Sequence, residues 1–313
     1  AYHGSVMGSV AVALAGGWER CVDPEWLAGW VPRAFDLGDG TTEVVVMGEG
    51  PSLLMLPPLP GYKEAWVGVA WRLARRFRVI TYDQRARFAG APSWEILLAD
   101  RERVADALAP GPAAVVGHSL GGALAQRWAL ARPERIAGLV LSSSFARVGS
   151  TRGHWRTRYL EQSLVLASQR WLPEGLAVPL ARRLAARGRW VYDAHCDARI
   201  LAFVRHAIRR VPVAVARRSV RLAFAHDTRA ELPRLVCPTL LVVGERETPW
   251  ARAATDELAR LIPRAQARTS PGVAHLHPLS GAAWLAEIVG EWLTGVPRVA
   301  PGARDRDGFP PPC

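Results

Sequence analysis

The chain has 313 residues, of which 50% are apolar and 22% are charged, and this composition excludes an intrinsically disordered protein. A chain of this length can bury a large core, as one big domain or two modest ones. Its net charge of +12 comes almost wholly from arginine, but no zinc-finger, RNP or basic-zipper pattern accompanies it, so nucleic acid is not an expected partner.

Short apolar runs rich in β-branched residues alternate with segments of helical period. Strands are predicted for six runs, at 43–47, 53–56, 78–82, 113–117, 138–142 and 239–244. Helices are predicted for four segments, at 64–76, 94–109, 121–131 and 282–293. Continuous apolar strands that alternate with helices predict an α/β fold, in which a mostly parallel, doubly wound sheet is covered on both faces.

The alternation stops after Ser144 and resumes at Pro238. Between these points the pattern is helical throughout, which predicts an all-helical insertion in the sheet. The predicted organisation is an N-terminal extension (1–34), an α/β core (35–147 and 228–296), a helical cap (148–227) and a disordered Pro/Gly-rich tail (297–313).

The inserted segment carries the net charge of the whole chain. Between Phe145 and Ala230 there are 17 arginines and five acids, so the rest of the chain sums to zero. A region of this kind can attract phosphates, anionic lipid or acidic substrates. Its arginines can also simply cover solvated helix faces, and the sequence leaves both interpretations open.

The sequence does not support a membrane span, a metal site or a disulfide framework. The longest uncharged run, 107–126, is broken by Gly, Pro, Ser and His, so no membrane span is predicted. The four cysteines form no CxxC pair, which predicts neither a metal site nor a disulfide framework. Segment 1–18 has a short apolar centre without a preceding basic residue, so it fits a signal peptide poorly and a cytoplasmic location is expected. The oligomeric state stays open.

Three prolines follow the predicted strand at 53–56, in the sequence Pro57-Pro58-Leu59-Pro60. Proline has no backbone N–H, so it ends a sheet ladder and leaves Leu59 as the one donor between Leu56 and Gly61. Prolines on both sides also restrict the backbone conformation at this position. The loop is therefore expected to be rigid and to offer a single N–H.

The run at 113–117 leads into Gly117-His118-Ser119-Leu120-Gly121 and then into a helical segment. A G-x-S-x-G pattern between a strand and a helix is the signature of a nucleophile elbow. Small residues two before and two after Ser119 keep the neighbouring backbone clear, and the helix N-terminus favours negative charge. The alternative is a Gly-rich turn in which Ser119 only caps the helix.

With these features the chain resembles an α/β-hydrolase of the capped esterase, lactonase and proline-iminopeptidase-like type, from about Phe35 to Leu293. Beside the elbow, the segments that carry the resemblance are FDLGDGTTEVVVMGEGPSLLML, RVITYDQRARFAGAP, GLVLSSSF and DTRAELPRLVCPTLLVVGERETP. They are similar, in turn, to the first hairpin with the third strand, the fourth strand with its D-x-R-G-x-G loop, the sixth strand and the return from the cap. His118 stands at a position of variable identity and is expected to pack, whereas Ala86 departs from the usual Gly.

The resemblance implies a catalytic triad in the chain order serine, acid, histidine, with Ser119 as the nucleophile. In the family the acid lies three residues after the glycine that ends the late strand, which makes it Glu247, while Glu245 stays a possible rival. The base lies within TSPGVAHLHPLSG and is taken as His275, with His277 as its rival.

Relatives end the third strand in His-Gly-x-Pro, and the N–H of x is one of two oxyanion donors. In this chain the His and Gly are replaced by prolines, yet Leu59 keeps an N–H at the donor position. The second donor in the family is the N–H after the nucleophile, which is that of Leu120. The resemblance therefore implies an oxyanion hole made by these two backbone groups.

The expected activity is that of a serine hydrolase that cleaves a carboxylic ester, lactone or thioester through an acyl-enzyme, with no cofactor and no metal. The expected partner is a small ester-like substrate, which is anionic if the arginines line the entrance. Two alternatives stay open on the same scaffold: a biosynthetic cyclase, lyase or acyl-transfer enzyme, suggested by the altered His-Gly loop, and a ligand-binding protein. A serine nucleophile disfavours haloalkane dehalogenases and epoxide hydrolases, whose relatives carry Asp there.

Overall fold

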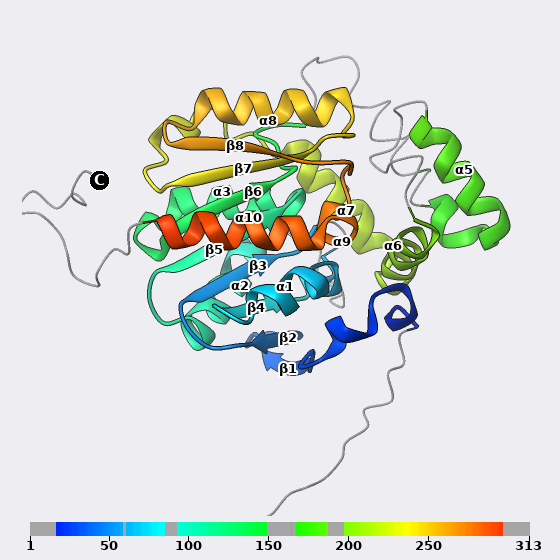
Figure 1. Cartoon of the computed structure of the whole chain (residues 1–313), viewed down its shortest axis with the longest axis horizontal. Coiled ribbons are helices and arrows are strands. Elements are labelled where there is room, and N and C mark those ends of the chain that lie inside the picture. The colour runs from blue at the N-terminus through cyan, green and yellow to red at the C-terminus, as the bar shows by residue number, and fades with distance from the viewer. Residues whose placement is uncertain are drawn as a thin grey trace, which may run out of the picture.

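The centre of the molecule is a single sheet of eight strands in the order β1-β2-β4-β3-β5-β6-β7-β8 (Figure 1). The computed structural model describes residues 17–58, 61–84, 93–148, 164, 167–186 and 197–296. The strands are β1 (Arg33–Asp36), β2 (Thr41–Met47), β3 (Ser52–Leu56), β4 (Arg78–Tyr82), β5 (Ala113–His118), β6 (Ile136–Ser142), β7 (Thr239–Gly244) and β8 (Ala265–Ser270).

The sheet is antiparallel at one edge and parallel elsewhere. β2 pairs antiparallel with β1 and with β4, and every pairing from β4 to β8 is parallel. All residues of the central strands β5 and β7 are buried, as expected for parallel strands covered on both faces. The carboxyl ends of these strands therefore meet along one edge of the sheet, where side chains from distant parts of the chain can converge.

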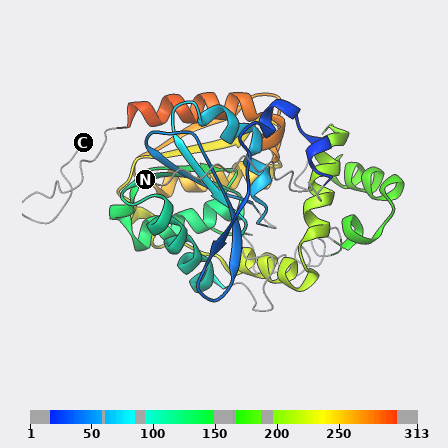
Figure 2. The same ribbon diagram turned by 90° about the horizontal axis from the view of Figure 1, so that it is seen from below.

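Helices cover both faces of the sheet (Figures 1 and 2). One apolar cluster packs alternate strand residues against α1 (Val67–Leu73), α9 (His277–Ser280) and α10 (Ala282–Gly295). The other cluster packs the remaining strand residues against α2 (Trp94–Leu108), α3 (Leu120–Ala131) and α8 (Pro249–Leu261). Short 3₁₀ helices add η1 (Glu19–Cys21), η2 (Pro24–Leu27), η3 (Lys63–Trp66), η4 (Pro133–Arg135) and η5 (Leu232–Arg234).

The predicted fold class is confirmed. Each of the six predicted runs is a strand of this sheet, and the predicted helices are present within one to three residues of their expected bounds. The segment 64–76 differs, because its first turn is the 3₁₀ helix η3 and α1 ends at Leu73. β8 is not among the predicted runs, since four of its six residues are exposed and it lacks an apolar pattern.

Helices of the segment between β6 and β7 stand outside the two layers, beyond the end of the sheet (Figures 1 and 2). They include α5 (Glu174–Ala186), α6 (Ala198–Arg210) and α7 (Val213–Ala225). An isolated antiparallel bridge between Arg147 and Asp227 joins the two points where the chain leaves and re-enters the core. Arg210 of α6 donates to the Tyr62 hydroxyl at 2.9 Å, which ties these helices to the segment just before η3.

Several expectations concern residues outside this description. The predicted tail (297–313) and the first 16 residues of the predicted extension lie there, as do Cys196 and Cys313. Cys21 and Cys237 are free thiols. Within the described ranges, no helix is long and apolar enough to cross a membrane, and no group of three or more His, Cys, Asp or Glu side chains is placed to hold a metal ion.

Candidate active site

Ser119 lies on a sharp turn between β5 and α3, at the carboxyl edge of the sheet. Its backbone angles, φ 53° and ψ −117°, are unusual for a residue with a side chain and match the strained turn of a nucleophile elbow. Two contacts hold the turn, one to the last residue of β6 and one to the segment after it. The Ser119 N–H donates to the carbonyl of Ser142 at 2.9 Å, and the Ser144 hydroxyl donates to the carbonyl of Ser119 at 3.0 Å.

The glycines of the elbow are required by close backbone contacts. A Cβ at Gly117 would lie 2.5 Å from the carbonyl oxygen of Gly121, on the first turn of α3. A Cβ at Gly121 would lie 2.2 Å from the carbonyl oxygen of Leu56 and 2.6 Å from that of Pro57. Because those are backbone atoms, α3 can approach the end of β3 only with glycine at this position. The elbow therefore packs directly against the start of the proline loop.

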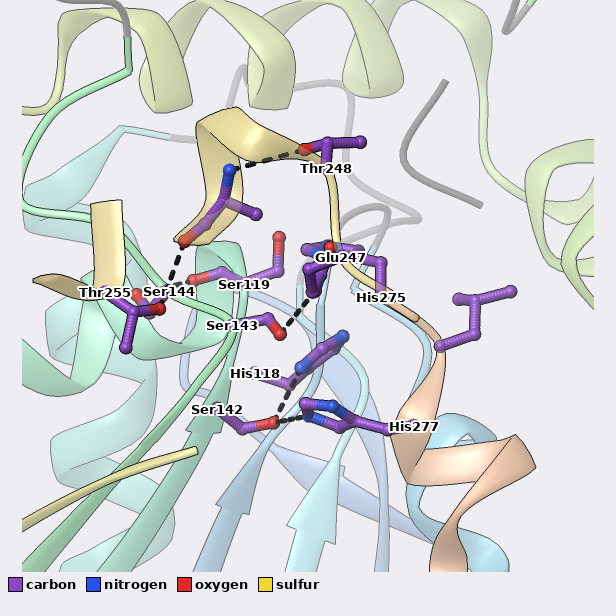
Figure 3. A network of polar contacts seen from close by, with 12 residues as sticks. His118, Ser119, Ser142, Ser143, Ser144, Glu247, Thr248, Thr255, His275 and His277 are labelled. Atoms are coloured by element: carbon purple, nitrogen blue, oxygen red, sulfur yellow. Dashed lines mark hydrogen bonds and ion pairs between the residues drawn. The ribbon is translucent and has the colours of Figure 1, made fainter. Parts of the chain in front are cut away.

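His275 and Glu247 are brought together from the loops that follow β8 and β7. His275 Nδ1 lies 2.9 Å from Glu247 Oε1, and both side chains are buried. The His275 ring also lies against that of His118, with ring centroids 4.9 Å apart, so it sits beside the residue that precedes Ser119. In Figure 3 the side chains of Ser119, His275 and Glu247 gather above the strand ends, over His118 and Ser142.

The Glu247 carboxylate is held in its ionised form. Burial by itself favours the protonated acid, but contacts with His275 and Ser143 outweigh it, so the pKa of Glu247 lies below its usual value. The Ser143 hydroxyl donates to Oε1 at 2.5 Å, and Ser143 adopts a positive φ of 42° just after β6. The carboxylate thus accepts from two donors at one oxygen, while no described residue donates to Oε2.

The two rival residues have other partners. The exposed Glu245 carboxylate accepts the N–H of Gly272 at 2.5 Å, which ties the end of β7 to the loop after β8. His277 Nε2 lies 2.5 Å from the Ser142 hydroxyl, and this ring is completely buried. Glu245 therefore does not take the place of Glu247 beside His275, and His277 does not take the place of His275 beside Glu247.

The two predicted oxyanion donors differ in what the structure shows. Leu120 is the first residue of α3, and an N–H in the first turn of a helix has no partner within the helix. Leu59 lies outside the described residues. On either side of it the backbone is anchored: Gln84 Nε2 donates to the carbonyl of Pro57 at 3.0 Å, and the Gly61 N–H donates to that of Pro58 at 2.5 Å.

An apolar cluster adjoins the elbow. Leu120 and Ala123 of α3 are buried together with Phe145, which follows β6, and Ala254 of α8, and two tryptophans pack around them, Trp94 and Trp250. The Phe145 and Trp250 rings lie 5.9 Å apart. The surroundings of the Ser119 turn are therefore apolar on this side.

Sequence reasoning missed the three serines Ser142, Ser143 and Ser144, which contact the elbow, the acid and two histidines. The signal was present as a run of hydroxyl residues at the end of a central apolar strand. Gln84, inside the segment RVITYDQRARFAGAP, was missed as the anchor of the proline loop.

Comparisons with known proteins agree on the fold. Residues 51–282 match the family described as alpha/beta hydrolase fold. The chain is 32% identical over 240 residues to a pimeloyl-[acyl-carrier protein] methyl ester esterase of Nitrosomonas europaea, which covers 74% of this chain and 92% of the relative. An enzyme of the same name from Chromobacterium violaceum is 30% identical over 246 residues, covering 76% of this chain and 92% of the relative.

Solved structures give the same result. A thermophilic esterase from Thermogutta terrifontis superposes with a TM-score of 0.66 at 25% identity, covering 85% of this chain and 98% of that one. An enol-lactonase from Burkholderia xenovorans superposes with a TM-score of 0.66 at 22% identity, covering 84% of this chain and all of the other. The second likeness concerns the fold alone.

Proposed function

The chain belongs to the α/β-hydrolase family and is a hydrolase of ester bonds, and from this premise we propose that Ser119, His275 and Glu247 are its catalytic triad. The observation that carries the proposal is the buried contact between His275 Nδ1 and Glu247 Oε1 beside a strained Ser119 turn. A carboxylate at Nδ1 keeps the proton on that nitrogen and leaves Nε2 as the base. Glu247 also stabilises the imidazolium that forms when His275 takes a proton.

The reaction then runs in two halves. Ser119 Oγ attacks the acyl carbon while its proton passes to His275 Nε2, and the tetrahedral intermediate collapses as His275 returns that proton to the leaving alcohol or thiol. Water repeats the sequence on the acyl-enzyme, giving the free acid and restoring Ser119. Leu59 and Leu120 supply the N–H groups that stabilise the oxyanion in both halves. The anchored backbone at Pro57, Pro58 and Gly61 supports this role for the proline loop.

The substrate is proposed to be a carboxylic ester, lactone or thioester with an anionic group. The segment 148–227, which includes α5, α6 and α7, forms the cap over the carboxyl edge of the sheet, with 35–147 and 228–296 as the core. The charge of this segment favours acidic substrates by attraction over the distance of a Debye length. The apolar cluster around Phe145 favours an apolar part beside the ester. A cytoplasmic location stays a prediction from the sequence.

Labelling with a fluorophosphonate probe, together with a panel of methyl, p-nitrophenyl, lactone and thioester substrates, tests the proposal. We expect the protein to be labelled at Ser119 and to release free acid. Ser119→Ala should abolish labelling and lower kcat by about 10⁴- to 10⁶-fold, with an unchanged far-UV circular dichroism spectrum. Labelling at another serine, or equal turnover by the alanine variant, would rule the mechanism out.

A further inference from the structure

Beneath the proposed triad lies a second set of polar side chains, which the proposed reaction does not use. His277 Nε2 lies 2.5 Å from Ser142 Oγ, and His118 Nδ1 lies 2.9 Å from the same oxygen (Figure 3). The three side chains are at most 1% exposed. They come from the first turn of α9, the end of β6 and the end of β5, so one hydroxyl links three separate elements.

The hydroxyl makes the two rings a single unit. A serine has one hydroxyl proton, so one ring accepts that proton and the other ring donates an N–H to Oγ. The accepting ring must be neutral, because it needs a free lone pair on its nitrogen, and burial favours the neutral form of both rings. Burial lowers the pKa of His277 to about 4 and the pKa of His118 well below its usual value. The unit is therefore uncharged at neutral pH.

This unit contacts the proposed base. The His118 ring centroid lies 4.9 Å from that of His275 and 5.2 Å from that of His277. His277 follows His275 by two residues, so its bond to Ser142 fixes the end of the loop that carries His275. Because both supporting rings are neutral, they place no positive charge beside the imidazolium that His275 becomes during the reaction.

We propose that His277 and His118, joined through Ser142, are positioning residues that keep the His275 ring aimed at Ser119. This inference rests on the function proposed above for Ser119 and His275. Misplacement of a reacting group by about 1 Å can lower a rate by about 10²-fold, so loss of the link should lower kcat while KM changes little.

A matched pair of serine variants gives the first test. Ser142→Ala removes the linking hydroxyl, whereas Ser270→Ala removes an equally buried hydroxyl, at the end of β8, that has no partner among the described residues. We expect Ser142→Ala to lower kcat about tenfold or more, with KM within about twofold. Ser270→Ala should retain the parent kcat.

The histidines give a sharper test, because each ring uses a different nitrogen. The amide nitrogen of glutamine reaches about the place of Nε2, and that of asparagine reaches about the place of Nδ1. His277, which bonds through Nε2, should therefore be replaced better by glutamine than by asparagine. His118, which bonds through Nδ1, should show the opposite order. We expect His277→Gln and His118→Asn to keep kcat about tenfold higher than His277→Asn and His118→Gln.

Packing alone predicts a different outcome. If the two rings only fill space, kcat should follow the thermal unfolding midpoint of each variant, and the crossed order of glutamine and asparagine should be absent. That result, or a Ser142→Ala enzyme with the parent kcat, would overturn the inference. Failure of the proposed function is seen separately, since the parent protein would then show no labelling at Ser119 and no turnover of any ester.

Discussion

At the scale of single residues, two glutamates only two positions apart have different environments. Glu247 is buried against His275 and Ser143, whereas Glu245 is exposed and accepts the Gly272 N–H. Glu247→Gln keeps the volume but removes the charge that stabilises the imidazolium, so kcat should fall by about 10³- to 10⁴-fold. Glu245→Gln should lower kcat less than about threefold. Steady-state kinetics on one p-nitrophenyl ester compares them, and similar losses in both variants would reverse the assignment of the acid.

The proposed base and nucleophile, His275 and Ser119, give a second prediction at the same scale. His275→Ala removes the proposed base and should lower kcat about as much as Ser119→Ala does, because residues of a triad act as a unit. The double variant should then be no slower than either single variant. A double variant slowed by the product of the two single effects would mean that the two side chains act independently.

The resemblance to the family implied that Glu247 pairs with His275, but it did not imply the neighbours that hold this pair. The elbow pattern and the position after Gly244 are local, so they can be read from the sequence. The role of Ser143 depends on β6 lying beside β7, where its N–H donates to the carbonyl of Val242 at 2.7 Å. A contact between residues about one hundred positions apart leaves no local pattern.

At the scale of elements, the close approach of α3 to the end of β3 controls the geometry of the elbow. Gly121→Ala places a Cβ against two backbone carbonyls, which must move, so the variant should lose about 1–3 kcal/mol of unfolding free energy and much of its kcat. Gly175→Ala in α5 is the control, because nothing lies within 4 Å of its Cβ and its stability should stay the same or rise by up to about 1 kcal/mol. Urea unfolding measures both. Equal stability of the two variants would contradict the tight packing of α3.

The 3₁₀ helix η3 contributes two buried residues, Lys63 and Glu64, to a charge cluster that makes stability depend on pH. Lys63 contacts Glu43, Glu64 and Asp83 within 3.0 Å, so three carboxylates share this one ammonium group. Burial, and then repulsion by Asp83, raise the pKa of Glu64 to about 7 although Lys63 opposes them. Because this pKa is higher in the folded protein than in the unfolded chain, the folded state binds the proton more tightly between about pH 4.5 and 7. Stability is therefore lost as the pH rises through that window.

Glu64→Gln removes this titration and leaves Lys63 with two carboxylates. The difference in unfolding free energy, variant minus parent, should therefore increase by about 1–3 kcal/mol from pH 5 to pH 8. Urea unfolding at the two pH values measures it, and titrating groups that do not interact with Glu64 cancel in the difference. A difference that stays constant would mean that Glu64 titrates near its ordinary pKa.

A strand or helix could be predicted from the sequence where all of its residues share one environment. β5 and β7 are apolar throughout because both of their faces are covered, and their sequences show it. β8 at the edge of the sheet has four exposed residues and no such pattern. The proline loop could be predicted only in part. Its missing N–H groups follow from the sequence, but its anchoring by Gln84 depends on where the loop after β4 lies.

At the scale of the whole molecule, the described inserted helices are joined to the rest of the chain at a few defined points. α6 contributes Phe203, Val204 and Ile208 to the cluster that also contains α1 and α10. Arg210 reaches the Tyr62 hydroxyl, and the Arg147–Asp227 bridge lies at the base of the insertion. The fixed position of these helices beside the carboxyl edge of the sheet is what would allow their charge to act on a substrate.

The charge of the inserted segment leads to a prediction about substrates. Arg217 and Arg218 are exposed on α7, whose buried side chains are Val215, Ser219 and Val220. If the segment attracts anionic esters, kcat/KM for such an ester should fall as salt rises, because the Debye length shrinks from about 30 Å at 0.01 M to about 8 Å at 0.15 M. A neutral ester of the same acyl length should respond much less.

Charge-reversal variants test whether this attraction arises from the inserted segment. Arg217→Glu/Arg218→Glu changes the charge of α7 by four units and should lower kcat/KM for the anionic ester about tenfold at 0.01 M salt, with little effect at 0.5 M. Arg260→Glu is the control, since this exposed residue lies near the end of α8, about three turns from the end that follows Glu247. It changes the net charge by two units, so it reports the effect of total charge. If the logarithm of kcat/KM for the anionic ester fell no more than twice as far in the α7 variant as in the α8 variant, the arginines would be solvated surface without a part in substrate capture. An equal response of neutral and anionic esters would mean the same.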